Sequence, residues 1–374
     1  MKLDINPKET EAIRPGPILP QTAYWARLKE KHGYKTIAFD IKSGLPERNL
    51  TKWKSHHQLF DDLLVVIRRI SPYKSIAYVP YGPTTEPRDD LRGPLLEALS
   101  ETIRPFLPDD CIMIRYDLPW QSPWMEDENT YNDHGNWTGP PEPRIQEMRM
   151  NFDTRNWNLQ KAPSDVLPAH TIFLDLKQEE ESILKKMKSK TRYNIRLSGR
   201  RGVKVKKAGI NDLPAWYSIY LETTKRNGII RDEIKYFDAV INTQAAESAS
   251  PARTILLMAE DDNRKLAGML MTISGGRATY LYGASSSNNR NKMATYALQW
   301  KAITLAKETG CKEYDMFGVA GHPHPSHPMY GLYRFKSGFG GELFHRQGCW
   351  DYPFNPDKYN QYRMAEMNQG GYHN

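Results

Sequence analysis

The sequence predicts a mixed α/β fold divided into two domains. The chain has 374 residues, which is long for one average domain and suitable for two. Hydrophobic residues make up 39% of it, enough for a sizeable core. In both halves, runs with strand character alternate with segments of helical periodicity, and this alternation is typical of layered α/β proteins.

In the first half, short apolar runs alternate with longer periodic segments. Strands are expected at 36–41, 75–79 and 111–118, and helices at 59–70 and 89–106. The sequence PYGP at 80–83 is a turn signal.

Residues 119–143 break this pattern. The segment holds five prolines and three of the nine tryptophans. So long a stretch without regular elements is usually functional or disordered, and its aromatic residues favour an ordered lid or insertion.

The second half repeats the layout of strand, helices, strands, helix and strand, without a sequence repeat. The helix expected at 292–309 has the strongest pattern, because Met293, Tyr296 and Trp300 recur at helical spacing and Gly310 can end it. Three further helices are expected at 179–201, 213–226 and 233–246. Strands are expected at 171–176, 254–260, 265–274, 277–283 and 314–319. The domain boundary should fall within 158–168, where prolines and polar residues cluster.

Composition indicates a soluble, cytoplasmic protein. The first ten residues are charged and lack the apolar core of a signal peptide. A clean apolar run such as 63–67 has five residues, whereas a membrane span needs about 20. Cys111, Cys311 and Cys349 are odd in number and lack metal-ligand spacing, so we expect reduced, mostly buried thiols.

Positive charge is concentrated in one segment. The net charge of +8 is modest, but residues 182–211 contain eleven Lys or Arg and no acidic residue. Lys185, Lys188, Arg192 and Arg196 fall at helical spacing on one face of the expected helix. A solvated helix face usually mixes charges of both signs, because like charges at this spacing are destabilising. We therefore interpret the segment as a surface that faces an anion, either an RNA backbone or a diphosphate.

Two other segments carry weaker signals. A small-residue loop after Tyr282 leads into the helix at 292–309, as in anion-binding loops, but it lacks the glycines of a coenzyme A pyrophosphate loop. The sequence 330–341 crowds glycines and aromatics around Lys336, and the plainest interpretation is a turn-rich connection with a surface lysine.

Cofactor and metal chemistry finds little support in the sequence. It contains no Walker A, dinucleotide-binding, HExxH or nucleophile-elbow motif. His322, His324 and His327 have no nearby cysteine or carboxylate to complete a metal site. We expect neither a metal nor a cofactor.

Motifs spread along the chain carry a family resemblance. They are AYWARLK at 23–29, YVPYGP at 78–83, IRYD at 114–117, KTRYNIR at 190–196, NGI at 227–229, YGAS at 282–285 and YRFK at 333–336. With them, the chain resembles the FemABX family of peptidoglycan interpeptide-bridge aminoacyltransferases. The segment 213–252 has no room for the helical arm of some members.

The resemblance implies two tandem domains like those of acyl-CoA N-acyltransferases (GNAT-like). Domain 1 would span residues 1–164, completed by 341–374, and domain 2 would span 165–340. The donor would be an aminoacyl-tRNA and the acceptor UDP-MurNAc-pentapeptide or a lipid-linked muropeptide. The protein would act as a monomer, with at most peripheral membrane contact.

The same resemblance implies roles for individual residues. Asp117 would lie near the acceptor amine, and Phe335 and Lys336 would line the channel for the tRNA acceptor end. Lys336 would also stabilise the tetrahedral oxyanion. The basic residues Lys185, Lys188, Arg192 and Arg196 would bind tRNA. Acceptor-binding residues would be Lys29, Tyr81, Arg231, Tyr236 and Tyr282.

Two other functions stay open at this point. One is a coenzyme A-dependent N-acyltransferase on the same fold, and the other is an aminoacyl-tRNA–protein transferase. A non-catalytic tRNA-binding protein is disfavoured, because Asp117 and the Phe335–Lys336 pair are both present.

Overall fold

The computed structural model describes residues 3–43, 59–133, 137–228, 231–321 and 324–368. The chain divides into two compact units. Unit 1 comprises Met1–Arg14, Pro20–Ala169 and His345–Asn374, and unit 2 comprises Pro15–Leu19 and His170–Phe344. The predicted mixed α/β character is confirmed in both.

The sheet of unit 1 takes strands from both ends of the chain. Its order is β1-β2-β3-β4-β5-β13, with β6 also paired to β13. The β4–β5 pair is parallel and the others are antiparallel. The strands are β1 (Leu3–Lys8), β2 (Lys35–Ser43), β3 (Leu59–Ser71), β4 (Lys74–Val79), β5 (Cys111–Gln121), β6 (Gln160–Lys161) and β13 (Glu342–Pro353).

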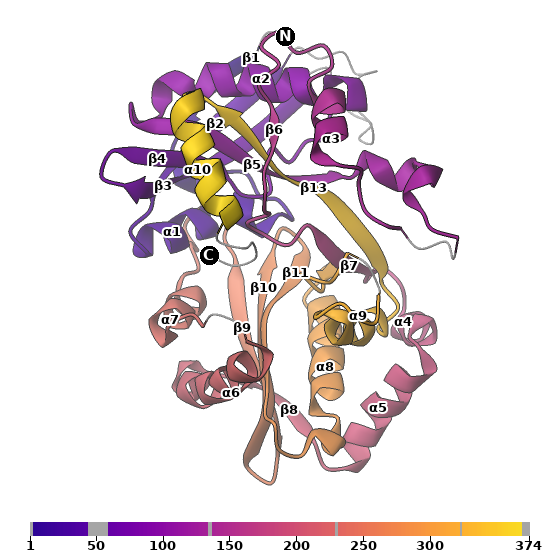
Figure 1. Cartoon of the computed structure of the whole chain (residues 1–374). Coiled ribbons are helices and arrows are strands. Elements are labelled where there is room, and N and C mark those ends of the chain that lie inside the picture. Colours follow the sequence, from indigo (N-terminus) through magenta and orange to yellow (C-terminus); the bar gives the residue numbers. More distant parts are fainter. Residues whose placement is uncertain (1–2, 44–58, 134–136, 229–230, 322–323, 369–374) are drawn as a thin grey trace. The chain divides into compact units, whose positions relative to one another are not determined.

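Helices cover this sheet, and its core combines aliphatic residues with aromatic residues such as Phe39, Tyr116 and Trp120. The helices are α1 (Ala23–Lys31), α2 (Arg92–Ile103), α3 (Pro143–Met150) and α10 (Pro356–Asn368). Residues of α2 such as Leu96 and Leu99 are buried against strand residues such as Val65 and Ile114. The C-terminal helix α10, yellow in Figure 1, contacts β5.

The helix expected at 59–70 is wrong, because these residues form strand β3. The strand pairs with β2 on one side and β4 on the other. Residues 61–67 are buried without a break, so this part of the strand has no solvent-exposed face. A short apolar run that is covered on both faces cannot be told from a buried helix by periodicity alone.

The strands of unit 2 follow the order β7-β12-β11-β10-β9-β8. The β11–β12 pair is parallel and the others are antiparallel. The strands are β7 (His170–Asp175), β8 (Lys204–Ala208), β9 (Arg253–Asp261), β10 (Arg264–Ser274), β11 (Arg277–Ser285) and β12 (Glu313–Asp315).

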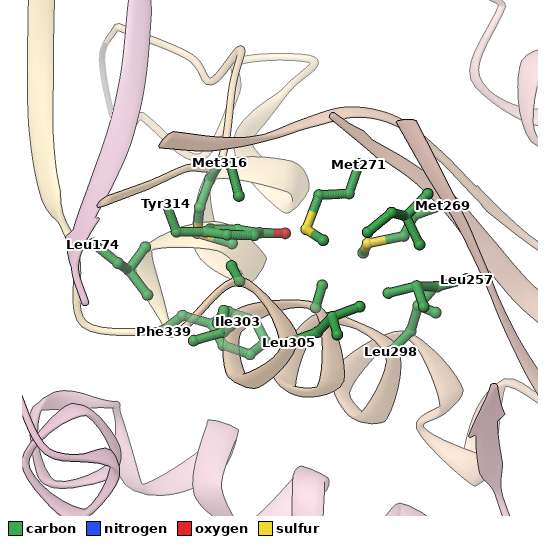
Figure 2. Packing of buried hydrophobic residues seen from close by; sticks show 14 of the residues in the cluster. Leu174, Leu257, Met269, Met271, Leu298, Ile303, Leu305, Tyr314, Met316 and Phe339 are labelled. Carbon is green, nitrogen blue, oxygen red and sulfur yellow. The ribbon is translucent and has the colours of Figure 1, made fainter. Parts of the chain in front are cut away.

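Helix α8 covers the core of unit 2. Figure 2 shows Leu298 and Ile303 of this helix in the same cluster as Met269 and Met271 of β10 and Tyr314 of β12. The helices are α4 (Glu180–Lys186), α5 (Ser189–Arg200), α6 (Leu213–Asn227), α7 (Ile234–Asn242), α8 (Ala294–Glu308) and α9 (Tyr330–Ser337).

Three expectations for unit 2 need correction. The strand expected at 314–319 ends at Asp315. The turn-rich connection expected at 330–341 contains the helix α9. The single helix expected at 179–201 is interrupted at Met187 and Lys188, which have extended backbone conformations. Met187 is buried in the core there, and the Lys188 N–H donates to the Gly338 carbonyl at 2.9 Å.

The expected burial of the three cysteines is confirmed, and all three are unpaired. The described part of 119–143 contains two short 3-10 helices, Pro123–Glu126 and Glu128–Thr130, and a bridge between Tyr131 and Trp137. Its role as a lid or insertion stays a prediction. Within the described ranges, we find no helix with the length and apolar character needed to cross a bilayer.

Candidate active site

Lys336 is a buried cation near the end of α9. Only 5% of its surface is exposed, so the interpretation of Lys336 as a surface lysine is wrong. Its Nζ donates to the carbonyl oxygens of Phe317 at 3.1 Å and Gly318 at 2.8 Å, in the loop after β12. The ammonium also lies 5.1 Å from the centre of the Tyr280 ring. Burial lowers the pKa of Lys336 to about 7, and the charge of Asp315 partly opposes this shift.

Phe335, the neighbour of Lys336, lies in an aromatic cluster. Its half-buried ring packs edge-on against Tyr296 of α8 at 5.1 Å and against Phe339 at 5.4 Å. The cluster joins the end of α9 to α8. Phe335 therefore fixes the helix that carries Lys336.

Asp117 of β5 is fully enclosed in unit 1. Its Oδ2 accepts hydrogen bonds from the Tyr78 hydroxyl and the Leu167 N–H, both at 2.9 Å. No donor among the described residues reaches Oδ1. Burial, and then the nearby Asp165, raise the pKa of Asp117 to about 7.

The raised pKa of Asp117 predicts a pH-dependent stability. Between its unfolded pKa of about 4 and its folded pKa of about 7, the folded chain holds the proton more tightly. Stability should therefore fall as pH rises through this window, by about 1.4 kcal/mol per pH unit. Urea denaturation from pH 4 to pH 8 should show this contribution in the wild type but not in Asp117→Asn. The exposed Asp109→Asn is the control, and equal pH slopes in wild type and Asp117→Asn would contradict the prediction.

Two predicted acceptor-binding residues of unit 1 have aromatic or cationic neighbours. The Tyr81 hydroxyl donates to the Pro168 carbonyl at 2.7 Å, and the Arg346 guanidinium lies 4.5 Å from the centre of its ring. The Lys29 ammonium lies 4.8 Å from the centre of the Trp25 ring. Tyr81 is buried, whereas Lys29 is half-buried.

In unit 2 the structure brings together Tyr236 and Tyr282. Their hydroxyl groups are 2.8 Å apart and their rings pack edge-on. Burial, and then the neighbouring Tyr236, raise the pKa of Tyr282 well above its usual value. Arg231 lies before α7 in the sequence and is exposed.

The interruption of the basic helix separates its predicted tRNA-binding residues. Lys185 lies on α4 and Lys188 precedes α5, and both are exposed. Arg196 is exposed on α5. The Arg192 guanidinium turns back to the carbonyl oxygens of Lys185 and Met187 and so caps the end of α4.

The structure adds four residues that the sequence did not single out for the site. Tyr78 donates a hydrogen bond to Asp117, the ring of Tyr280 lies beside the Lys336 ammonium, and the charge of Asp315 acts on Lys336. Tyr193 of α5, 55% exposed, adds an aromatic ring to the basic surface. An acidic residue within the apolar run at 314–319 was a signal that could have identified Asp315. Its orientation, however, depends on the turn that follows.

The small-residue loop after β11 already holds a carboxylate. Oε2 of Glu222 accepts the Ser286 hydroxyl at 3.2 Å and the Ser287 N–H at 3.0 Å. These groups would otherwise be donors for a pyrophosphate, so the occupied loop weighs against coenzyme A binding. Among the described residues, no three His, Cys, Asp or Glu side chains gather as metal ligands. His322 lies outside those residues.

Comparison with known proteins connects both units to one family. A model of the FemAB family matches residues 18–250 and 248–367. Among curated proteins, the chain is 22% identical over 254 residues to a lipid II:glycine glycyltransferase of Staphylococcus haemolyticus, covering 52% of this chain and 61% of that protein. A protein of the same name from Staphylococcus saprophyticus is 21% identical over 251 residues, with 52% and 60% covered. The matched region thus spans about three-fifths of the length of these relatives.

The fold is also similar to that of a solved protein. The crystal structure of FemX superposes with a TM-score of 0.70 at 16% identity, covering 95% of this chain and 96% of FemX. Likeness at this identity shows that the two proteins share a fold.

Proposed function

Because the chain belongs to the FemAB family, we propose that it transfers an amino acid from aminoacyl-tRNA to a side-chain amine in the stem peptide of a peptidoglycan precursor. The observation that carries the proposal is the family match, which includes residues of both units. The relatives named for lipid II support a lipid-linked acceptor, and a soluble UDP-linked precursor has the same peptide chemistry.

The environment of Lys336 fits stabilisation of an oxyanion. The donor ester is already activated, so attack by the amine needs no covalent enzyme intermediate. Attack creates a negative oxygen, and a protonated lysine has three N–H donors. Two of these donate to the carbonyl oxygens of Phe317 and Gly318, which leaves one for the oxyanion within the part of the chain described.

The enclosed Asp117 fits a positioning role better than proton transfer. A substrate amine has a reference pKa near 10.4, so it arrives protonated and must lose a proton before it attacks. Asp117 is 0% exposed, and its carboxylate holds the Tyr78 hydroxyl. In the proposal, Tyr78 orients the acceptor ammonium and a hydroxyl of the donor's terminal ribose relays the proton.

The other predicted binding residues complete the proposal. Lys29 and Arg231 bind the acceptor diphosphate. The Tyr236–Tyr282 pair and Tyr81 bind other parts of the acceptor. Lys185, Lys188 and Arg196 bind the tRNA backbone, and Arg192 holds α4 in place for them.

Binding of tRNA should depend steeply on salt. The logarithm of the affinity should fall linearly with the logarithm of the salt concentration, because each neutralised phosphate releases counterions. Replacing the exposed Arg196 by alanine should reduce that slope by about one unit. The measurement is a filter-binding titration at several salt concentrations. Exposed Lys312→Ala serves as the control, and a flat salt dependence in the wild type would assign the basic segment to solvent contact alone.

The test of the function is a transfer assay. The protein is mixed with tRNA charged with radiolabelled amino acids, and with either UDP-linked muramyl pentapeptide or its lipid-linked form in detergent. We expect label in the peptide of at least one acceptor, and none with acetyl-coenzyme A as donor. Label appearing only on added proteins would instead indicate an aminoacyl-tRNA–protein transferase. Absence of transfer to every acceptor would overturn the proposal.

A further inference from the structure

Asp315, the last residue of β12, is a buried acid that organises the loop after it. It is 4% exposed. Its Oδ1 accepts the N–H of Phe317 at 2.8 Å and also the hydroxyl of Thr171 from the adjacent strand β7. A single carboxylate oxygen thus joins β7, β12 and the loop that follows.

That loop holds an unfavourable backbone conformation. Phe317 has a φ of 56°, in the left-handed region, where a residue with a side chain costs about 1–2 kcal/mol. The carbonyl oxygens of Phe317 and Gly318 both accept from Lys336 Nζ. The N–H of Phe317 donates to Asp315. This hydrogen bond helps to hold the left-handed conformation in which the carbonyl oxygens of Phe317 and Gly318 face Lys336.

Among the described residues, Asp315 is also the acid whose negative charge favours the protonated form of Lys336. The ring of Tyr280 of β11 lies beside the ammonium, and burial raises the pKa of Tyr280 to about 12, so it is neutral at pH 7. The carbonyl acceptors carry no net charge. A buried ammonium is costly without a compensating charge, and Asp315 offsets part of that cost.

We propose that Asp315 is a positioning residue for Lys336, which keeps the lysine protonated and keeps its carbonyl acceptors in place, and that Thr171 holds Asp315 for this task. The inference rests on the proposed function, in which Lys336 stabilises the oxyanion.

Two substitutions separate the charge of Asp315 from its geometry. In Asp315→Asn the side-chain oxygen can still accept from Phe317 and Thr171, but the negative charge is lost. In Asp315→Ala both the charge and the hydrogen bonds from Phe317 and Thr171 are lost. The first variant should change the titration of Lys336, and the second should also lower kcat at every pH with little change in KM.

The neighbouring strand offers a matched control. Asp175 ends β7 as Asp315 ends β12, and its Oδ1 accepts the N–H two residues further on, Lys177, at 3.0 Å. Asp175 is exposed. Asp175→Asn therefore makes the same chemical change in the same kind of turn, away from the interior.

The experiment is an NMR titration of the full chain carrying ¹³Cε-labelled lysine, without substrate, with the Lys336 signal assigned by its loss in Lys336→Met. We expect the Lys336 midpoint to fall by about one pH unit or more in Asp315→Asn and to stay unchanged in Asp175→Asn. In the transfer assay, the pH at which kcat falls should decrease by the same amount. A decrease of one pH unit lowers kcat at pH 8 about tenfold. An unchanged midpoint in Asp315→Asn would overturn the proposal.

A second pair of variants covers a failure of Asp315→Asn to fold. Thr171→Val removes the hydroxyl that holds Asp315, and Thr171→Ser keeps it. We expect Thr171→Val to lower the Lys336 midpoint and kcat, and Thr171→Ser to restore both. Equal midpoints in the two variants would count against the proposal. Because the titration needs no substrate, a shifted midpoint in a protein without transfer activity would support the link between Asp315 and Lys336 while rejecting the proposed function.

Discussion

Replacing Lys336 by methionine should lower kcat for aminoacyl transfer by about 100- to 1,000-fold, with little change in KM for the acceptor. A donor aimed at an oxyanion commonly contributes about 3–4 kcal/mol to transition-state stabilisation, and the contact forms only as charge develops. Methionine has a similar length and fits an apolar interior, so packing should be kept. The measurement is steady-state transfer at pH 6.5, where most of the lysine is protonated.

The same variant has a stability signature that does not depend on catalysis. The folded pKa of Lys336, about 7, lies below its unfolded value of about 10.4, so the unfolded chain binds the proton more tightly between these limits. Wild-type stability should therefore gain about 1.4 kcal/mol per pH unit from this group as pH rises from 7 to 10, and Lys336→Met should lack that gain. Exposed Lys312→Met is the control for both measurements. Unchanged kcat in Lys336→Met would remove the lysine from the mechanism.

Replacing Arg115 by methionine should destabilise unit 1 by about 3–5 kcal/mol. Arg115 of β5 is 2% exposed, and its guanidinium bonds Asp351 of β13 at 2.7 and 2.8 Å and Glu366 of α10 at 2.7 and 2.8 Å. Asp351 is 0% exposed. Removal of Arg115 would leave the buried carboxylate of Asp351 beside Glu366 without a compensating positive charge.

Urea denaturation followed by tryptophan fluorescence measures this effect. Arg69→Met is a suitable control, because Arg69 pairs with Asp110 at 2.9 Å on an exposed surface, where ion pairs contribute little. The double variant Arg115→Met with Asp351→Leu should recover part of the lost stability. A single variant as stable as the wild type would show that water solvates Asp351 or that another residue compensates its charge.

Regular elements with a clear pattern were predictable from the sequence. Helix α8 lies within the expected 292–309, although 302–306 are buried without a break and only Glu308 of the helix is exposed. Strand β3 was not predictable as a strand, since burial on both faces erased its alternation. The interruption at Met187 depends on the core that receives this side chain and on Gly338, which lies about 150 residues further along the chain.

The candidate site was likewise predictable only in part from the sequence. Lys336 and Asp117 were named from motifs, but their burial and altered pKa values arise from residues distant in sequence. Arg192 looked like one more charge of a basic face, and only the interruption of the helix turns it into a cap for α4. Asp315 matters to the site because it binds the backbone N–H of Phe317. No local sequence pattern predicted the left-handed conformation of Phe317.

The position of β13 in the sheet of unit 1 has a consequence for synthesis on the ribosome. Strand β5 ends at Gln121 and its partner β13 begins at Glu342, so 220 residues lie between them. At about 5–20 residues per second, this interval lasts roughly 10–45 s. During that time one edge of β5 has no permanent partner, and unpaired strand edges invite aggregation. The nascent chain should therefore depend on chaperones until β13 emerges, and a stop codon before Glu342 should give an insoluble product.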